Sequence, residues 1–188
     1  KRTAAVMDKV CVINSMNTTQ GAHEQGSYVM HTSYALRGTI KHPALGSWVL
    51  RLGGRIHPEL PPFVAIGSSP EFTGGGVLGA QFGAAMIGSP EDGLRASHRN
   101  AQVSPEDSQR RLALAAQLNR QFHERFPNAD VKAYEELYRE AVALMNSKDL
   151  EAFAPRKESA ATRELYGNGR FSQGCLLARR LVQHGVRF

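Results

Sequence analysis

The chain has 188 residues, 41% of them hydrophobic and 21% charged, with a formal net charge of +6 at pH 7. This length is enough for one domain with its own core or for most of a larger one, and the apolar content argues against a largely disordered chain. No apolar run approaches the roughly 20 residues of a membrane span, and the basic residues are scattered, so we expect neither a membrane span nor a nucleic-acid partner.

The first segment, residues 1–56, carries one strand-like and two helix-like patterns. The apolar run at residues 10–13 has the length and β-branching of a buried strand. A polar loop follows this run, and we expect a helix to begin near Ala22. After a break at His42 and Pro43, a second helix is predicted to reach Gly53. Its apolar stripe, which we expect to face the core, consists of Leu45, Trp48, Val49 and Leu52.

The second segment, residues 57–103, is rich in glycine, proline and serine. Residues 63–66 read as a buried strand, and the loop-dominated stretch around them is of the kind that often borders a functional cleft. Three consecutive glycines at 74–76 lack the lysine and hydroxyl of a phosphate-binding loop. They therefore predict a flexible or tightly turning backbone.

The third segment, residues 104–165, is predicted to be a helical pair. Ser104 caps the first helix, Pro105 occupies its first position, and Pro127 ends it after about Phe126. The second helix begins after Asp130. We expect the two helices to be antiparallel and to pack on a sheet through the apolar stripe of the second. That stripe consists of Tyr134, Leu137, Tyr138, Ala141, Leu144 and Met145.

The last segment, residues 166–188, is predicted to be a helix that leads into a strand. Gly185 is placed to end this helix, and residues 186–188 have the pattern of a strand opening. Two cysteines, Cys11 and Cys175, lie far apart without metal-type spacing. We expect buried free thiols, although the sequence leaves a disulfide open.

The strongest candidate site in the sequence is the pair Thr19 and His23. A threonine four residues before a histidine at a helix start lies beside unpaired backbone N–H groups and the positive end of the helix dipole. This arrangement suits a phosphate or sulfate ester, with Thr19 as the candidate nucleophile. The alternative is that Thr18 or Thr19 only caps the helix.

Metal ligands are sparse in the sequence. Before residue 71 the only carboxylates are Asp8, Glu24 and Glu59, and no histidine pair has the spacing of a zinc signature. His23 and His31 lie eight residues apart, on one face of the predicted helix. The chain therefore supplies no recognisable cluster for a two-metal hydrolase.

Several segments carry a family resemblance, in one order along nearly the whole chain. They are residues 7–16, 28–32, 42–48, 60–64, 75–79, 152–153 and 163–167, together with His23. The most specific stretch reads Cys-Leu-Leu-Ala-Arg-Arg-Leu-Val at 175–182 and Gly-Val-Arg-Phe at 185–188. The chain resembles a bacterial family known as domain of unknown function 1501, which belongs to the alkaline phosphatase and sulfatase superfamily.

The resemblance implies an α/β fold, in which a mostly parallel sheet is flanked by helices, and a protein exported from the bacterial cytoplasm. In related superfamily members a Ser or Thr nucleophile commonly stands four residues before a histidine at a helix start, which Thr19 and His23 match. Full-length family members extend on both sides, where the metal ligands would lie. We therefore expect residues 1–188 to be a single partial domain. A divalent metal is expected in the full-length protein, and none is expected to bind tightly to this chain.

Three hypotheses follow for function. The leading one is a metal-dependent hydrolase of sulfate or phosphate esters, with Thr19 as nucleophile and His23 nearby. The alternative is a binding or structural module that keeps the sulfatase-like fold without turnover, which the scarcity of carboxylates favours. Nucleic-acid binding is the least favoured of the three. The substrate and the oligomeric state are left open.

Overall fold

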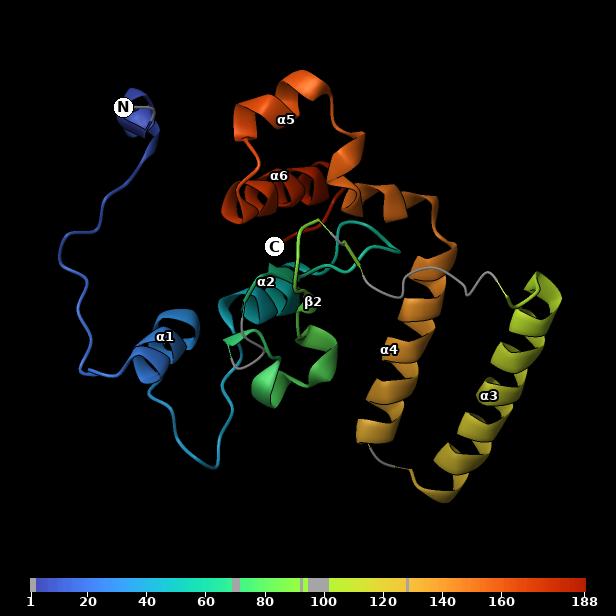
Figure 1. The fold of residues 1–188 in the computed structure, drawn as a ribbon. Helices are drawn as coiled ribbons and strands as arrows, with labels where there is room; N and C mark the ends of the chain where they lie inside the picture. The colour runs from blue at the N-terminus through green and yellow to red at the C-terminus, as the bar shows by residue number, and fades with distance from the viewer. Residues whose placement is uncertain (1–2, 69–71, 92, 95–101, 128) are drawn as a thin grey trace.

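The computed structural model describes residues 3–68, 72–91, 93–94, 102–127 and 129–188 (Figure 1). The helices and strands are, in chain order, α1 (His23–Thr32), α2 (Leu45–Gly53), β1 (Val64–Ile66), β2 (Ala85–Ile87), α3 (Pro105–Arg125), α4 (Ala129–Asn146), α5 (Ala160–Tyr166) and α6 (Arg170–Gln183). Short 3-10 helices are η1 (Thr3–Lys9), η3 (Gly76–Leu78), η4 (Ala80–Phe82), η5 (Lys148–Phe153) and η6 (Pro155–Lys157). No helix within these ranges is both long and apolar enough to cross a membrane.

A small parallel sheet lies at the centre of the fold. β1 and β2 pair in parallel, with Val64 opposite Ala85. The end of the chain lies along the other edge of β1, where the Phe188 N–H donates to the Pro62 carbonyl (3.2 Å) and the Phe188 carbonyl accepts from the Val64 N–H (2.9 Å). This is the bonding pattern of a parallel ladder. The predicted strand at 63–66 is confirmed, and the chain has a mixed α/β structure.

The hydrophobic core is formed where α6 meets the sheet and the 3-10 helix η5. Its buried members are Leu60, Ile87, Ala152, Phe153, Leu177, Leu181 and Val186. The end of α6 is fixed by a glycine with φ +89°, Gly185, whose N–H donates to the Val182 carbonyl (3.1 Å). The next N–H, of Val186, donates to the Leu181 carbonyl (2.9 Å). These two bonds form a Schellman motif, which confirms the predicted helix end and brings Val186 into the core.

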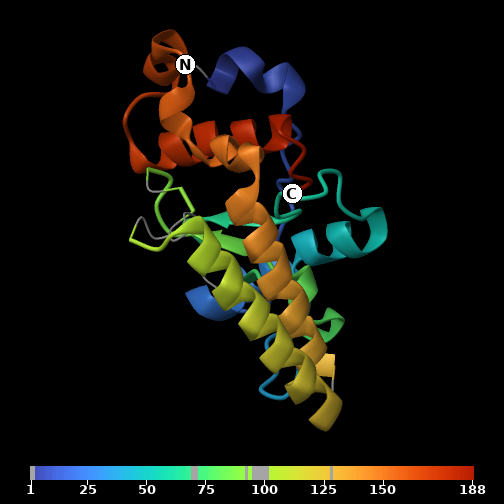
Figure 2. The same cartoon turned by 90° about the vertical axis from the view of Figure 1, so that its right-hand side faces the viewer.

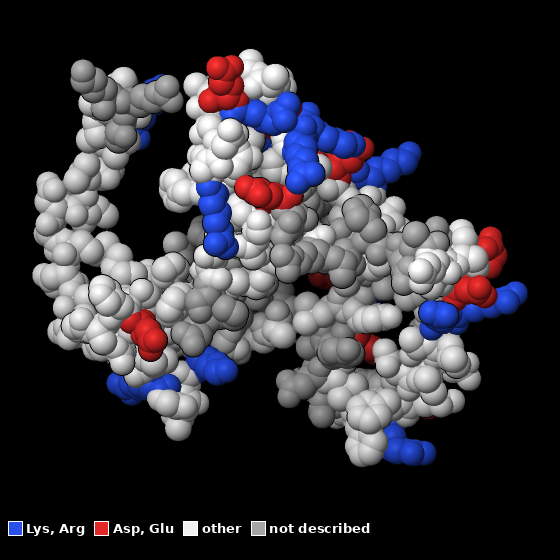
Figure 3. Space-filling model, in the orientation of Figure 1, with Lys and Arg blue, Asp and Glu red and all other residues white. Residues whose placement is uncertain are grey.

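A pair of arginines on α6 ties this helix to the segment before α5. The Arg180 side chain is nearly buried, and its Nη1 lies 2.5 Å from one Glu158 oxygen, while Arg179 Nη2 lies 2.7 Å from the other. Arg180 also donates to the carbonyls of Glu151 and Ala152. On the face shown in Figure 3, the basic side chains over α5 and α6 lie among acidic ones.

This network predicts a pH dependence of stability. The hydrogen bond from Arg180, and then that from Arg179, lowers the pKa of Glu158 below its ordinary value of 4.5. A carboxyl whose pKa is lower in the folded state stabilises the fold above its ordinary pKa, and this contribution is lost as the pH falls through the lowered value. We expect Glu158→Gln to reduce the melting temperature at pH 7 and to flatten its decline below about pH 4.5.

Melting curves measured between neutral and acidic pH test this expectation. Glu164→Gln, at an exposed position of α5, is the matched control and is expected to reproduce the wild-type profile. If Glu158→Gln shows the same acid-induced decline as the wild type, the assigned role of the network is wrong.

Helices α3 and α4 form the predicted antiparallel pair, which projects from the body of the molecule (Figure 2). The Ser104 hydroxyl accepts from the Asp107 N–H (3.0 Å), and α3 ends at Arg125, so both predicted ends are confirmed. The prediction that the α4 stripe lies in the core is wrong. Leu137, Tyr138 and Met145 are exposed, while Leu144 packs partly against the core; the Tyr134 side chain lies outside the described set. The other described members of the stripe are exposed because the hairpin extends beyond the sheet (Figure 2).

Three further expectations are corrected by the structure. Residues 10–13 form no strand and are exposed, with Ile13 63% accessible, because a strand is stable only beside a partner and none lies there among the described residues. The α2 helix is confirmed, but its apolar stripe faces outward, with Leu52 82% exposed. Small residues of α2, including Ser47, face inward because the helix lies close to the Gly74 turn. Cys11 and Cys175 are free, as expected, but both are exposed.

Candidate functional site

The predicted pair Thr19 and His23 lies in an exposed part of the chain. Helix α1 begins at His23, as predicted, and both side chains are exposed. The Thr19 hydroxyl accepts only a 3.4 Å hydrogen bond from the Gln20 side chain among the described contacts. The alternative interpretation is wrong: the N-cap is Ala22, and no side chain caps the helix. The first N–H groups of α1 are thus left without a side-chain cap beside this loop.

An aromatic cluster anchors α1 to the segment before α2. The Tyr28 hydroxyl accepts the His42 backbone N–H at 2.8 Å and shares a 3.0 Å hydrogen bond with His42 Nδ1. The Tyr34 ring stacks on His42 with 4.3 Å between centroids, and His31 stacks on Phe72 at 5.4 Å. His23 and His31, predicted on one face of a helix, are both in α1, but only His31 has a described ring partner. This cluster holds α1 against the segment before α2.

The glycine-rich turn at 74–76 packs against the start of α2. The Gly74 carbonyl accepts from the Ala44 N–H (3.1 Å) and from the Ser47 hydroxyl (3.0 Å). A Cβ on Gly75 would lie 1.9 Å from the Gly79 carbonyl oxygen, whereas a Cβ on Gly74 would meet nothing closer than 3.9 Å. The glycines therefore allow the backbone to approach itself closely, which confirms the tight-turn prediction.

A hollow opens at the carboxyl ends of the two parallel strands. It has a volume of about 660 Å³, and its walls come from β1 and its following residue Gly67, from Pro90 after β2, and from the first turns of α6. The lining residues are Val64, Ile66, Gly67, Pro90, Arg170, Phe171, Gly174, Cys175 and Ala178. In parallel α/β sheets, ligands bind at this edge.

Arg170 is the charged residue of this hollow, and we call the hollow with its arginine the strand-end site. The Arg170 Nη2 donates to the Gly88 carbonyl at 2.7 Å, just beyond β2. Arg170 also lines a second hollow, of about 400 Å³, on the β2 side. It is the first residue of α6, whose N-cap, Gly169, provides no side-chain cap. The guanidinium therefore lies beside the end of β2, and the first turn of α6 lines the same apolar hollow.

The chemistry of the strand-end site suits an anion with an apolar group attached. Arginine binds carboxylate, phosphate and sulfate oxygens through charge-assisted hydrogen bonds, and the start of a helix favours negative charge. Val64, Ile66 and Phe171 supply apolar surface beside them. No described contact joins Thr19 or His23 to this site.

The described side chains do not form a metal-binding site. Within them, no three His, Cys, Asp or Glu side chains lie close enough together to hold a metal ion. The described residues therefore do not fit a metal centre.

Arg170 and the strand-end site were not predicted from the sequence. A local signal existed, because Gly167 and Gly169 come just before the start of α6, and helix starts after glycines can bind anions. The position of Arg170 beside Gly88 depends on the packing of α6 across the sheet, which no local pattern reports.

The chain belongs to the family described as protein of unknown function (DUF1501), whose family model matches residues 1–188. This confirms the family resemblance that the sequence segments carry. Searches of curated proteins and of solved structures find no match to the chain.

Proposed function

We propose that this chain binds the anionic group of a sulfate or phosphate monoester at the strand-end site. In this arrangement Arg170 and the first N–H groups of α6 hold the anionic oxygens, and the apolar walls hold the organic part of the ester. The observation that carries the proposal is the position of Arg170, at an uncapped helix start and at the carboxyl edge of a parallel strand pair.

The second part of the proposal is hydrolysis of such esters at a different place, the exposed loop that carries Thr19. It rests on the resemblance to the alkaline phosphatase and sulfatase superfamily, which assigns the nucleophile position to Thr19, four residues before His23. The same resemblance implies a divalent metal, for which the described residues offer no ligand group. The Thr19 hydroxyl oxygen would bond to the sulfur or phosphorus atom as the bond to the ester oxygen breaks, and the hydroxyl proton would pass through solvent to the departing oxygen. Water would then hydrolyse the ester formed on Thr19 and restore its hydroxyl.

Binding without turnover is the alternative function. Two observations favour it: the exposure of Thr19 and the lack of a metal-binding group among the described side chains. Under this alternative the strand-end site still recognises the anion, but no metal-dependent rate is associated with it.

Calorimetric titration with 4-nitrophenyl phosphate and 4-nitrophenyl sulfate tests the binding proposal. We expect Arg170→Ala to weaken binding of the preferred ester about tenfold, because one charge-assisted hydrogen bond contributes roughly 1.5 kcal/mol. Arg163→Ala, which removes an exposed arginine from α5, is the matched control and should bind as the wild type does. Equal affinity of the Arg170→Ala and Arg163→Ala variants would show that the anion does not bind at this site.

Ester hydrolysis, measured with divalent metal added, separates the hydrolase from the binding module. Thr19→Ala should lose the metal-dependent rate, and Thr18→Ala is the control, because it removes the neighbouring hydroxyl. Equal rates for these two variants would contradict the nucleophile assignment. A metal-independent background in all of the proteins would support binding without turnover.

A further inference from the structure

Helix α3 is long and exposed on most sides. None of its 21 residues is buried, although it carries large apolar side chains. Leu114 and Leu118 are 57% and 56% exposed, and Phe122 and Phe126 are also exposed, with their rings 4.8 Å apart. A surface helix of this length is normally stabilised by burying one apolar face. The face that carries these side chains has no cover among the described residues.

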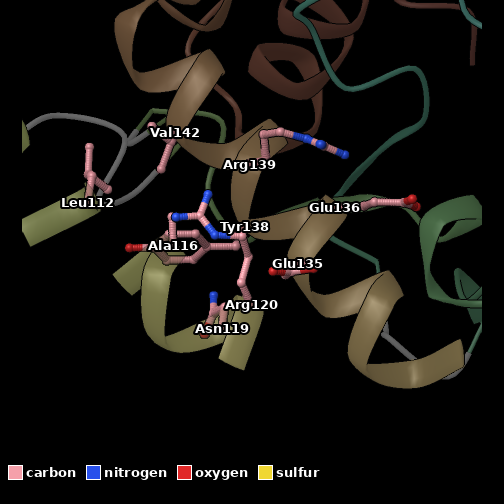
Figure 4. A pocket seen from close by; sticks show the side chains of 9 residues that line it. All are labelled: Leu112, Ala116, Asn119, Arg120, Glu135, Glu136, Tyr138, Arg139 and Val142. Carbon is pink, nitrogen blue, oxygen red and sulfur yellow. The ribbon is translucent and has the colours of Figure 1, made fainter. Parts of the chain in front are cut away.

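The contact between α3 and α4 uses a different face of α3. The half-buried residues of α3 that turn toward α4 are Ser108, Leu112, Ala115, Asn119 and His123. Between the helices lies a hollow of about 500 Å³, into which Arg120 of α3 and Tyr138 of α4 both reach (Figure 4). At 100° per residue, Leu114 and Leu118 lie roughly 120° around the helix from this contact. Helix α4 therefore leaves the leucine face free.

The leucine face belongs to a longer seam with the spacing of a coiled coil. The positions advance alternately by four and three residues, which keeps them on one side of a helix. The seam consists of Asp107, Arg111, Leu114, Leu118, Gln121 and Arg125. It is apolar at the centre and polar at both ends, acidic at its first position and basic at its last.

The order of residues in the seam is self-complementary for two antiparallel copies. When two α3 helices cross at the level of Ala116, Leu114 of one copy faces Leu118 of the other. In the same register Asp107 faces Arg125, and Arg111 faces Gln121. Opposite charges thus meet at both ends of the contact, and the helix dipoles also oppose each other. In a parallel pair each charged residue would face its own copy, so the charges select the antiparallel arrangement.

We infer that the α3 seam is the interface of a symmetric dimer of this chain, with the two α3 helices antiparallel and crossing at the level of Ala116. The neighbouring Arg110 lies 3.7 Å from Asp107, and both side chains are more than half exposed, so that this contact leaves Asp107 accessible. If a two-fold axis passes between the leucine pairs, the same surface is buried on both copies, as isologous interfaces require.

Sedimentation equilibrium of the chain tests the dimer. We expect Asp107→Arg and Arg125→Asp each to raise the dimer dissociation constant about tenfold, because each places like charges together at both ends of the interface. The double variant Asp107→Arg/Arg125→Asp restores opposite charges and should return the constant to the wild-type range. Glu106→Arg is the matched control, since it reverses a charge in the same turn but off the seam.

Leu118→Asp should raise the dissociation constant about a hundredfold or more, because it places a charge at the centre of the interface. Leu165→Asp, at an exposed position on α5, should leave it unchanged. Far-ultraviolet circular dichroism checks that the variants are folded. We expect a dissociation constant of about 1 µM for the dimer. A wild-type chain that is still monomeric at about 200 µM would therefore overturn the inference. Failure of the double variant to recover would exclude the antiparallel register.

Discussion

Leu177→Ala is expected to destabilise the fold by about 3–5 kcal/mol. The Leu177 side chain is completely buried, and it packs in the cluster that joins α6 to Leu60, Ile87 and Phe153. Removing it loses the hydrophobic transfer free energy and leaves a cavity that the packed neighbours fill only in part. Because a domain of this size is stable by only about 5–15 kcal/mol, the loss is a large share of the total. Urea denaturation at neutral pH measures the change in the free energy of unfolding.

The matched control is Leu165→Ala on α5, where the leucine is 68% exposed. This control should change the free energy of unfolding by no more than about 0.5 kcal/mol. A cost below about 1.5 kcal/mol for Leu177→Ala would contradict the central position that the structure gives this residue.

Gly75→Ala is expected to destabilise the fold by about 3 kcal/mol. Its φ of −70° suits any residue, so the cost comes from contact rather than from backbone strain. The added Cβ would lie 1.9 Å from the Gly79 carbonyl oxygen, a backbone atom that cannot move without opening the turn. The turn also holds the start of α2 through the Gly74 carbonyl, so its displacement would disturb that helix. Thermal and urea denaturation report the effect.

Gly74→Ala is an adjacent control with the same chemical change. The nearest atom to its added Cβ is 3.9 Å away, an ordinary contact distance, and we expect a change of less than about 1 kcal/mol. If the two alanine variants are equally stable, Gly75 does not lie as close to the Gly79 carbonyl oxygen as the structure places it.

The sequence predicted the elements whose ends depend on local chemistry. Ser104 and Pro105 start α3, and Gly185 ends α6, because capping and positive φ are properties of a few adjacent residues. The sequence-based predictions were wrong where an apolar pattern forms a core element only if another part of the fold packs on it. Residues 10–13 have the pattern of a strand, but no partner strand lies beside them among the described residues. The stripe of α4 has the pattern of a core helix, but of its described members only Leu144 packs against the core.

The candidate site divides in the same way. The start of α1 beside Thr19 and His23 is a local feature, and its position was predicted within one residue. Arg170 became a candidate only through its contact with Gly88, which is 82 residues away in the sequence. A contact across that separation depends on the packing of α6 on the sheet. The periodicity of the sequence predicts the helix that carries Arg170. It does not predict which strand end the Arg170 side chain contacts.

The projecting hairpin has a consequence for how this chain tolerates changes in length. The core draws its residues from both sides of the hairpin, from Leu60 and Ile87 before it and from Leu177 and Val186 after it. Closing a loop costs conformational entropy that grows only with the logarithm of its length, about 0.6 kcal/mol for each doubling. Whole turns added to or removed from the tip of α3 and α4 would therefore alter core stability little. Insertions and deletions should accumulate at that tip during evolution.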